Sequence, residues 1–190
     1  MDWYELADRA VERGALQKAG ELAALLALAS ERGVRSVLEI GAKHGGASWA
    51  FAQIAEHVTA IDLVPATWAT PGVHEIRGDS HSRSTSVAAH RGHGSPFDLI
   101  LIDGDHTYEG VRQDFETYSS LLASDGIVAI HDILTPNLPR FDNCEVRRFW
   151  QEVKQRHSHT EIIDPVEQQW HGGSLPADAG GIGILYGVAA

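Results

Sequence analysis

The stretch "LILIDGDHTYEG" at residues 99–110 joins four apolar residues directly to a turn that contains two acids and a histidine. A short apolar run that stops abruptly at glycine and polar residues is typical of a strand buried on both faces of a parallel sheet. Ligands bind beyond the carboxyl ends of such strands. The stretch therefore predicts a buried strand over 97–103, whose end at Asp103, Asp105 and His106 faces a functional site.

Strands and helices alternate on both sides of this stretch. Short β-branched or apolar runs predict strands, and amphipathic runs predict helices. The predicted order is helix 16–33, strand 36–41, helix 45–56, strands 57–63, 73–79 and 97–103, helix 108–122, strand 126–132, helix 146–155, and strands 160–164 and 181–189. Residues 90–96 and 165–181 are predicted loops, the second long enough for a mobile lid. This alternation predicts an α/β fold with one doubly wound, mostly parallel sheet.

The length and the net charge of the chain limit the classes of function that we expect for it. The chain has 190 residues, a net charge of -11 and one cysteine. We expect a single domain over 1–190, with N-terminal helices at 1–34 and a core at 35–190. The acidic balance disfavours a nucleic-acid partner. The longest apolar run, 22–29, is far shorter than the roughly 20 residues that cross a bilayer. The acidic start lacks the regions of a signal peptide, so we expect a cytoplasmic protein without a membrane partner; its oligomeric state is open, a homodimer included.

Glycines and acids end the first two predicted strands. Glu39 and Gly41 close strand 36–41, and Lys43 and Gly45 lead into a helix whose N-terminal amides a ligand could reach. A plain tight turn explains these glycines equally well. Asp62 follows Gly41 by about 21 residues, a separation at which an acid can accept hydrogen bonds from ribose hydroxyls. The competing interpretation of Asp62 is a solvated strand end.

The third predicted strand ends in "RGDS", where Asp79 and Ser80 could contact a purine or cap the next helix. Together with the preceding strand ends, this order resembles the class I S-adenosylmethionine-dependent methyltransferases. The pattern Glu39-x-Gly41-x-Lys43-x-Gly45 is similar to their E/D-x-G-x-G-x-G loop, with Lys43 in place of the middle glycine. The resemblance implies a Rossmann-like sheet of seven strands with an antiparallel last strand at 181–189. It also implies that S-adenosylmethionine is bound by Glu39, Gly41, Lys43, Gly45, Asp62, Asp79, Ser80 and Asp103.

The sequences "LIDGDHTY" and "IVAIHD" resemble the metal-dependent branch of small-molecule O-methyltransferases, whose members act on catechols, caffeoyl thioesters and macrolide sugars. The resemblance implies a divalent cation, Mg²⁺ or Mn²⁺, at Asp103 and Asp132, and adjacent strands about 4.8 Å apart can share an ion. His131 either joins these ligands, which favours softer ions, or packs. His106 matches the histidine that serves as general base in the sugar O-methyltransferases of this group. A small-molecule hydroxyl is the expected acceptor.

Other interpretations stay open. A histidine and an aspartate at a helix start often form a cap, which is the main interpretation of Asp105. A nicotinamide-dependent oxidoreductase shares the glycine loop and the acid of the second strand, although Asp103 and Asp132 would repel a pyrophosphate. A nucleotide-binding module without catalysis is a further alternative. Cys144 has no evident histidine partner, so a catalytic cysteine is not expected. Phe149 and Trp150 are predicted in the core, and the following histidines on the surface: His81, His90, His93, His157 and His159.

Overall fold

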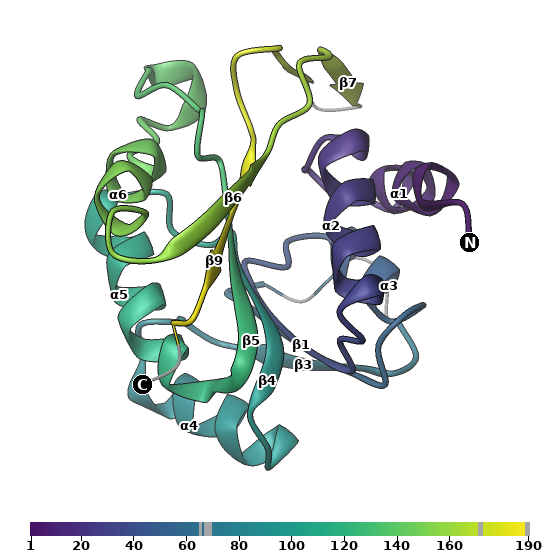
Figure 1. Cartoon of the computed structure of the whole chain (residues 1–190), viewed down its shortest axis with the longest axis vertical. Coiled ribbons are helices and arrows are strands. Elements are labelled where there is room, and N and C mark those ends of the chain that lie inside the picture. Colours follow the sequence, from purple (N-terminus) through teal and green to yellow (C-terminus); the bar gives the residue numbers. More distant parts are fainter. Residues whose placement is uncertain (65, 67–69, 171–172, 189–190) are drawn as a thin grey trace.

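The computed structural model describes residues 1–64, 66, 70–170 and 173–188. Its main sheet contains β1 (Ser36–Ile40), β2 (His57–Asp62), β3 (Val73–Arg77), β4 (Phe97–Ile102), β5 (Leu122–His131), β6 (Ser158–Ile162) and β9 (Ile182–Tyr186). The seven strands have the order β3-β2-β1-β4-β5-β9-β6 (Figure 1). Strands β1 to β5 are parallel to one another, and β9 is antiparallel to β5 and β6. The predicted mostly parallel sheet with an antiparallel last strand is confirmed.

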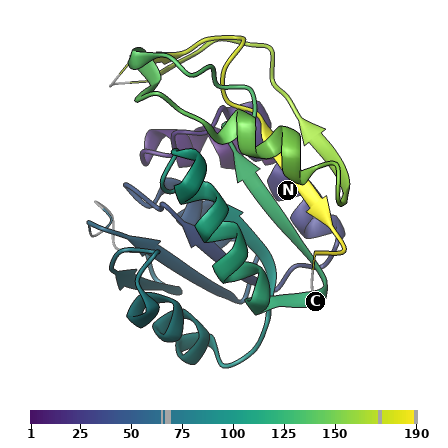
Figure 2. The ribbon, with the colours of Figure 1, turned by 90° about the vertical axis from the view of Figure 1, so that its left-hand side faces the viewer.

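Helices cover both faces of this sheet (Figures 1 and 2). On one face lie α1 (Trp3–Glu12), α2 (Ala19–Glu31) and α3 (Gly46–Phe51), and on the other lie α4 (Arg83–His93), α5 (Tyr108–Tyr118) and α6 (Val146–Val153). Two short 3₁₀ turns, Ser119–Leu121 and Pro139–Phe141, complete the helical segments. The described helices include none that is long and apolar enough to span a membrane.

The central strand β4 explains why the sequence is apolar up to Asp103. Leu99 and Leu101 pack on the α1–α3 side, whereas Ile100 and Ile102 pack on the α4–α6 side. All four side chains are at most 2% exposed. Because successive side chains of a strand point to opposite faces, a strand covered on both faces needs apolar residues at every position. The first position at which a charged side chain can meet solvent is therefore the strand end.

Two segments differ from the sequence prediction. Helix α4 extends to His93, so the predicted loop 90–96 is wrong over residues 90–93. Only Thr85 and Ala89 of α4 are buried, which leaves too little apolar periodicity to recognise. The predicted loop 165–181 contains a hairpin of β7 (Gln168–Trp170) and β8 (Gly173–Leu175). Residues 171–172 of that loop and residue 189 of the predicted last strand lie outside the described residues.

The ends of other elements shift by a few residues, and two core predictions are confirmed. Strand β5 begins at Leu122 rather than at residue 126, directly after the 3₁₀ turn that ends the α5 region. Phe149 and Trp150 are 5% and 0% exposed on α6, where they pack against the sheet. The apolar face of α6 therefore belongs to the core, as the spacing of its apolar residues predicts.

Candidate active site

The carboxyl ends of the parallel strands open into a cleft of about 1120 Å³. This volume exceeds that of a typical small-molecule site, so it has room for a nucleotide-sized cofactor and a second small molecule. The predicted site residues that line it are Glu39, Gly41, Lys43, Asp62, Asp79, Ser80, Asp103, His106, His131 and Asp132. Gly45 lies beside a separate, smaller cavity instead. All but one of the predicted site residues therefore line this cleft.

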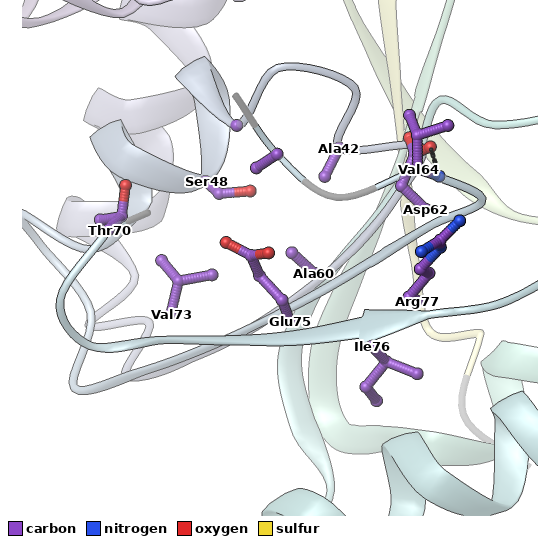
Figure 3. Close-up of a pocket in the computed structure, with 12 residues that line it drawn as sticks. Ala42, Ser48, Ala60, Asp62, Val64, Thr70, Val73, Glu75, Ile76 and Arg77 are labelled. Atoms are coloured by element: carbon purple, nitrogen blue, oxygen red, sulfur yellow. Dashed lines mark hydrogen bonds between the residues drawn. The ribbon is translucent and has the colours of Figure 1, made fainter. Parts of the chain in front are cut away.

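The smaller cavity lies between α3 and strands β2 and β3, and Figure 3 shows the side chains that line it. Ser48, Ala60 and Glu75 contribute to its wall. Its volume is about 20 Å³, which holds about one water molecule. Ligand binding therefore belongs to the large cleft.

The backbone of the loop after β1 adopts a conformation that lets a neighbouring segment approach it closely. Gly41 has φ +88°, and a Cβ there would collide with the backbone of Asp103. Lys43 has φ +50°, so it occupies the left-handed region although it replaces the glycine of the related loop. Asp62 fastens this loop, because its carboxylate accepts hydrogen bonds from the amides of Lys43 (2.7 Å) and Val64 (3.0 Å). The substitution at position 43 thus leaves the turn intact.

Glu39 lies beneath this loop and is fully enclosed. Its carboxyl accepts a hydrogen bond from the Ser48 hydroxyl of α3. Burial raises the pKa of Glu39 to about 8, in spite of the Ser48 hydrogen bond, which acts in the opposite direction. The nearby charges of Asp103 and Asp62 raise this pKa further. Glu39 is therefore protonated at neutral pH.

The raised pKa of Glu39 predicts a pH-dependent stability. The folded state keeps the proton up to about pH 8, whereas an unfolded glutamate loses it near about pH 4.3. Stability from this group is therefore complete at low pH and is lost as the pH rises toward the folded-state pKa. Glu39→Gln should flatten the fall in unfolding free energy between about pH 5 and pH 8, measured by urea denaturation. An unchanged slope, equal to that of the exposed control Glu31→Gln, would contradict the assignment.

Four side chains from the ends of β4 and β5 meet in the cleft and form the acid–histidine cluster: Asp103, His106, His131 and Asp132. Oδ1 of Asp103 lies 3.2 Å from Nε2 of His106 and 3.1 Å from Nδ1 of His131. Oδ2 of Asp132 lies 3.5 Å from each of the same two nitrogens. One ligand atom each from Asp103, His131 and Asp132 falls within a 4.8 Å limit of the others, which is the geometry of a candidate metal site.

Asp132 is held in an uncommon conformation. Its φ is +64°, in the left-handed region that aspartate tolerates better than most residues. Its Oδ1 accepts a hydrogen bond of 2.5 Å from the Thr135 hydroxyl. The hydroxyl oxygen of Thr135 in turn accepts a hydrogen bond from the amide of Gly180 (2.8 Å). The turn therefore fixes the Asp132 carboxylate so that Oδ2 faces the cluster.

The charges of the acid–histidine cluster compensate one another. Burial is the largest influence on the pKa of Asp103 and of Asp132 and would raise both, but His131 and His106 together outweigh it and lower both. Burial alone would lower the pKa of His131, but the two carboxylates hold it well above its ordinary value. His106 follows the same pattern, with Asp103 as the main partner that raises its pKa. The two carboxylates and the two imidazoles thus favour one another's charged forms.

Two polar residues that the sequence analysis missed support this cluster from α2 and the segment before it. Gln17 donates a hydrogen bond of 2.5 Å from Nε2 to Oδ2 of Asp103. Glu21 is fully buried, and its Oε2 lies 3.6 Å from Nε2 of His131. Its Oε1 accepts a hydrogen bond of 2.9 Å from the amide of Gly181. Nε2 of His131 thus faces Glu21, so that Nδ1 is the nitrogen directed at the two aspartates.

The available signal for Glu21 was a glutamate inside an otherwise apolar helix segment. Lys18 gives the same signal, since it is fully buried and donates from Nζ to the carbonyls of Asp164 (2.8 Å) and Ala177 (3.3 Å). The β7–β8 hairpin is anchored at the same place, because Gln168 bonds the amide of Ala19. Polar residues at the start of α2 therefore hold the wall of the cleft.

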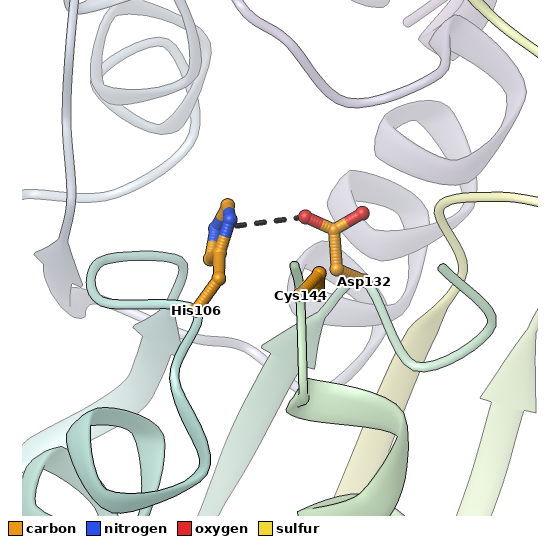
Figure 4. Close-up of side chains that lie close together, drawn as sticks. All are labelled: His106, Asp132 and Cys144. Atoms are coloured by element: carbon orange, nitrogen blue, oxygen red, sulfur yellow. Dashed lines mark ion pairs between the residues drawn. The ribbon is translucent and has the colours of Figure 1, made fainter. Parts of the chain in front are cut away.

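Cys144 and His81 lie in surroundings that the sequence analysis did not predict. Cys144 is 1% exposed, and its Sγ lies within 4.8 Å of ligand atoms of His106 and Asp132 (Figure 4). It therefore has a histidine neighbour after all. Burial raises its pKa to about 12, so the thiol is not a nucleophile at neutral pH. His81, predicted on the surface, lies 3.4 Å from the buried carboxylate of Asp114.

The cap of α5 also differs from the prediction. The Thr107 hydroxyl accepts the amide of Gly110 (3.0 Å) and is the N-cap. Asp105, two residues before the N-cap, instead accepts a hydrogen bond from the amide of Thr107 (2.9 Å). His106 is therefore not part of the cap, and its ring instead contacts Asp103 and Asp132 within the acid–histidine cluster.

Comparisons with known proteins agree with this fold. MycE methyltransferase of the mycinamycin biosynthetic pathway, in complex with Mg, SAH and mycinamycin VI, is 16% identical, with a TM-score of 0.65; the match covers 98% of this chain and 54% of that chain. The chain thus spans about half the length of MycE. O-methyltransferase TomG from Streptomyces achromogenes, involved in tomaymycin synthesis and in complex with SAM, is 18% identical, with coverages of 98% and 91% and a TM-score of 0.63.

An N-methyltransferase has the same fold. NodS from Bradyrhizobium japonicum WM9 is 18% identical, with coverages of 87% of this chain and 93% of that chain and a TM-score of 0.60. No curated protein matches the sequence. The family model described as a methyltransferase domain matches residues 38–133, just over half of the chain. The chain therefore belongs to the methyltransferase domain family, with the Rossmann-like fold of the class I S-adenosylmethionine-dependent enzymes.

Proposed function

We propose that the chain transfers the methyl group of S-adenosylmethionine to a hydroxyl of a small molecule, with a divalent cation bound by Asp103, His131 and Asp132 and with His106 as general base. The observation that carries the proposal is the acid–histidine cluster itself, in which two carboxylates and two imidazoles meet at the strand ends inside the cleft. Methyl transfer to a hydroxyl needs its proton removed, and this arrangement offers both a base and a cation site.

The cofactor end of the cleft is the loop after β1 together with the ends of β2 and β3. S-adenosylmethionine supplies the methyl group as a sulfonium. Gly41 and Lys43 expose the backbone of the loop to the cleft, and Asp62 places a carboxylate at the edge of β2. Asp79 and Ser80 lie on the same wall. These positions support a nucleoside held by its ribose and its base.

The three proposed ligands fit a small divalent cation. Asp103 and Asp132 offer carboxylate oxygens and His131 offers Nδ1, which suits Mg²⁺ or Mn²⁺ and somewhat softer ions. Glu21 behind His131 resembles the carboxylate partners that orient histidine ligands in metal sites. A bound cation there would lower the pKa of an acceptor hydroxyl and hold it in place.

His106 is the member of the cluster that can reach an acceptor. Its side chain is 35% exposed, whereas those of Asp103 and His131 are 9% and 4% exposed. Asp103 and Asp132 hold the imidazole in position and raise its pKa above the ordinary value. His106 accepts a proton once these carboxylates are engaged elsewhere, because its ordinary pKa is near about 6.5.

Because NodS is an N-methyltransferase with the same fold, an amine acceptor is the main alternative. A neutral amine is nucleophilic without a base of this kind, whereas a hydroxyl is not. His106 contacts two carboxylates that are proposed cation ligands, and this arrangement favours a hydroxyl as the acceptor. A nicotinamide cofactor is disfavoured, since Asp103 and Asp132 would lie close to its pyrophosphate.

The cofactor part of the proposal is tested by Asp62→Ala. The variant loses an acceptor for ribose hydroxyls and also the two hydrogen bonds that hold the loop at Lys43 and Val64. Each charge-assisted bond contributes roughly 1.5 to 3 kcal/mol, so binding of S-adenosylmethionine should weaken at least about tenfold. Calorimetric titration measures this. Asp125→Ala, an exposed acid near the opposite end of the sheet, should bind normally. Unchanged affinity in Asp62→Ala, or tight binding of NAD alone, would overturn the proposal.

A further inference from the structure

A second set of possible ligands overlaps the acid–histidine cluster. A ring nitrogen of His106, a carboxylate oxygen of Asp132 and Sγ of Cys144 lie within 4.8 Å of one another. Figure 4 shows that the three side chains come from three separate segments and lie close together. This thiol-containing set shares only Asp132 with the set of Asp103, His131 and Asp132. It also includes the single cysteine of the chain.

We propose that His106, Asp132 and Cys144 bind a thiophilic divalent cation such as Zn²⁺, and that its binding inhibits methyl transfer. The inhibitory part rests on the proposed function, because it follows from the role of His106 as base. The binding part depends only on the geometry of the three side chains.

The distances suit a tetrahedral ion. Ligand atoms 2.0–2.2 Å from a zinc ion at tetrahedral angles lie roughly 3.4 Å apart. The separation of Nε2 of His106 from Oδ2 of Asp132 is 3.5 Å. The remaining ligand pairs lie within 4.8 Å. Cys144 and Asp132 line the cleft, so an ion can enter from solvent, which also supplies a fourth ligand.

The segments that carry these ligands are tied together. The amide of Glu145 donates to the carbonyl of His106 (2.8 Å), and the amide of Tyr108 donates to the Glu145 carboxylate (3.3 Å). These bonds hold Cys144, at the start of α6, beside the loop of His106. Asp132 is fixed by Thr135 from the other side. Binding therefore requires little rearrangement of the backbone.

The two overlapping sets differ in chemistry. Thiolate and imidazole ligands favour Zn²⁺ and Co²⁺, whereas Mg²⁺ favours oxygen. When the ion binds, the thiol of Cys144 releases its proton to solvent and a metal–sulfur bond forms; a protonated Nε2 of His106 likewise releases its proton to solvent before it ligates. Nε2 of His106 then donates its lone pair to the ion, so it can no longer accept a proton from an acceptor. Asp132 is also withdrawn from the set that serves Mg²⁺.

Titration of the metal-free full chain with Co²⁺ tests binding without any activity measurement. The expected result is a thiolate-to-cobalt charge-transfer band in the near ultraviolet, and Zn²⁺ should displace the cobalt. Because the chain has one cysteine, the band reports Cys144 alone. It should vanish in Cys144→Ser and in Cys144→Ala, and weaken in His106→Gln. It should persist in Asp103→Asn, which leaves the thiol-containing set intact. Absence of the band in the parent protein would overturn the proposed site.

Inhibition is measured as the loss of the Mg²⁺-supported rate when Zn²⁺ is added, relative to each protein's own rate without zinc. The concentration of Zn²⁺ that halves the rate should rise roughly 10- to 100-fold in Cys144→Ser, the range that loss of a supporting group causes in metal sites. A cobalt–thiolate band with equal zinc inhibition in both proteins would overturn the inhibitory role while retaining the site. A protein without methyl transfer to any acceptor would refute the proposed function, and the cobalt spectrum would still decide the site.

Discussion

Replacing His106 with alanine should lower kcat by roughly 10²- to 10⁴-fold, which is the usual contribution of a general base. The affinity for S-adenosylmethionine should stay nearly unchanged, because His106 lies with Asp103 and Asp132 at the end of the cleft that we propose for the acceptor. Thermal stability should also change little, since the ring is 35% exposed and does not cap α5. The measurements are steady-state kinetics at saturating cofactor, calorimetric binding and thermal unfolding.

The matched control is Thr107→Ala, one residue further along the same loop. Thr107 caps α5 through its bond to Gly110, so its loss should lower stability by about 1 kcal/mol and change kcat only slightly. The two variants thus separate a catalytic role from a structural one by opposite patterns. If His106→Ala keeps its full rate at every pH and loses stability like Thr107→Ala, the base assignment is wrong.

Asp103→Asn should cause a loss of comparable size by a different route. Asp103 contacts His106, His131 and Gln17, and its carboxylate is a proposed ligand. The amide keeps the shape and removes the charge. A cation contributes several kcal/mol to charge stabilisation in such sites, so kcat should fall on the order of 10²-fold or more. Mg²⁺ and Mn²⁺ should also no longer restore activity after treatment with a chelator.

Asp105→Asn provides the control for this variant, because Asp105 lies in the same loop and bonds the amide of Thr107 rather than the cluster. It should keep its metal response. Direct binding of Mn²⁺, measured by calorimetry or by electron paramagnetic resonance, distinguishes a lost ligand from a misfolded protein. Normal Mn²⁺ binding and a normal rate in Asp103→Asn would remove this acid from the metal site.

The sheet could be predicted because its strands carry their own signal. Strand β4 is apolar at every position from Leu99 to Ile102, and this part of the strand is buried on both faces for the same reason. The strand-end acids Asp103 and Asp132 could be predicted to meet, since β4 and β5 are parallel neighbours with aligned carboxyl ends. Local sequence and parallel topology are sufficient for these features.

Contacts that form only when distant segments of the chain pack together could not be predicted in this way. Glu21 reaches His131 from α2, and Cys144 reaches His106 because the start of α6 is bonded to the loop after β4. Neither contact follows from a period or a spacing. Helix α4 was missed because its polar sequence buries only Thr85 and Ala89. The supporting parts of the site therefore required the three-dimensional structure.

The most direct test of the proposed reaction is transfer of an isotopically labelled methyl group from S-adenosylmethionine to a panel of small hydroxyl and amine compounds. Each reaction is run with Mg²⁺ and with a chelator, and mass spectrometry locates the label in the product. The account predicts label on an oxygen atom, formed with Mg²⁺ and absent with the chelator. Label on nitrogen, or equal labelling of oxygen in the presence of the chelator, would contradict metal-assisted O-methylation by Asp103, His131 and Asp132.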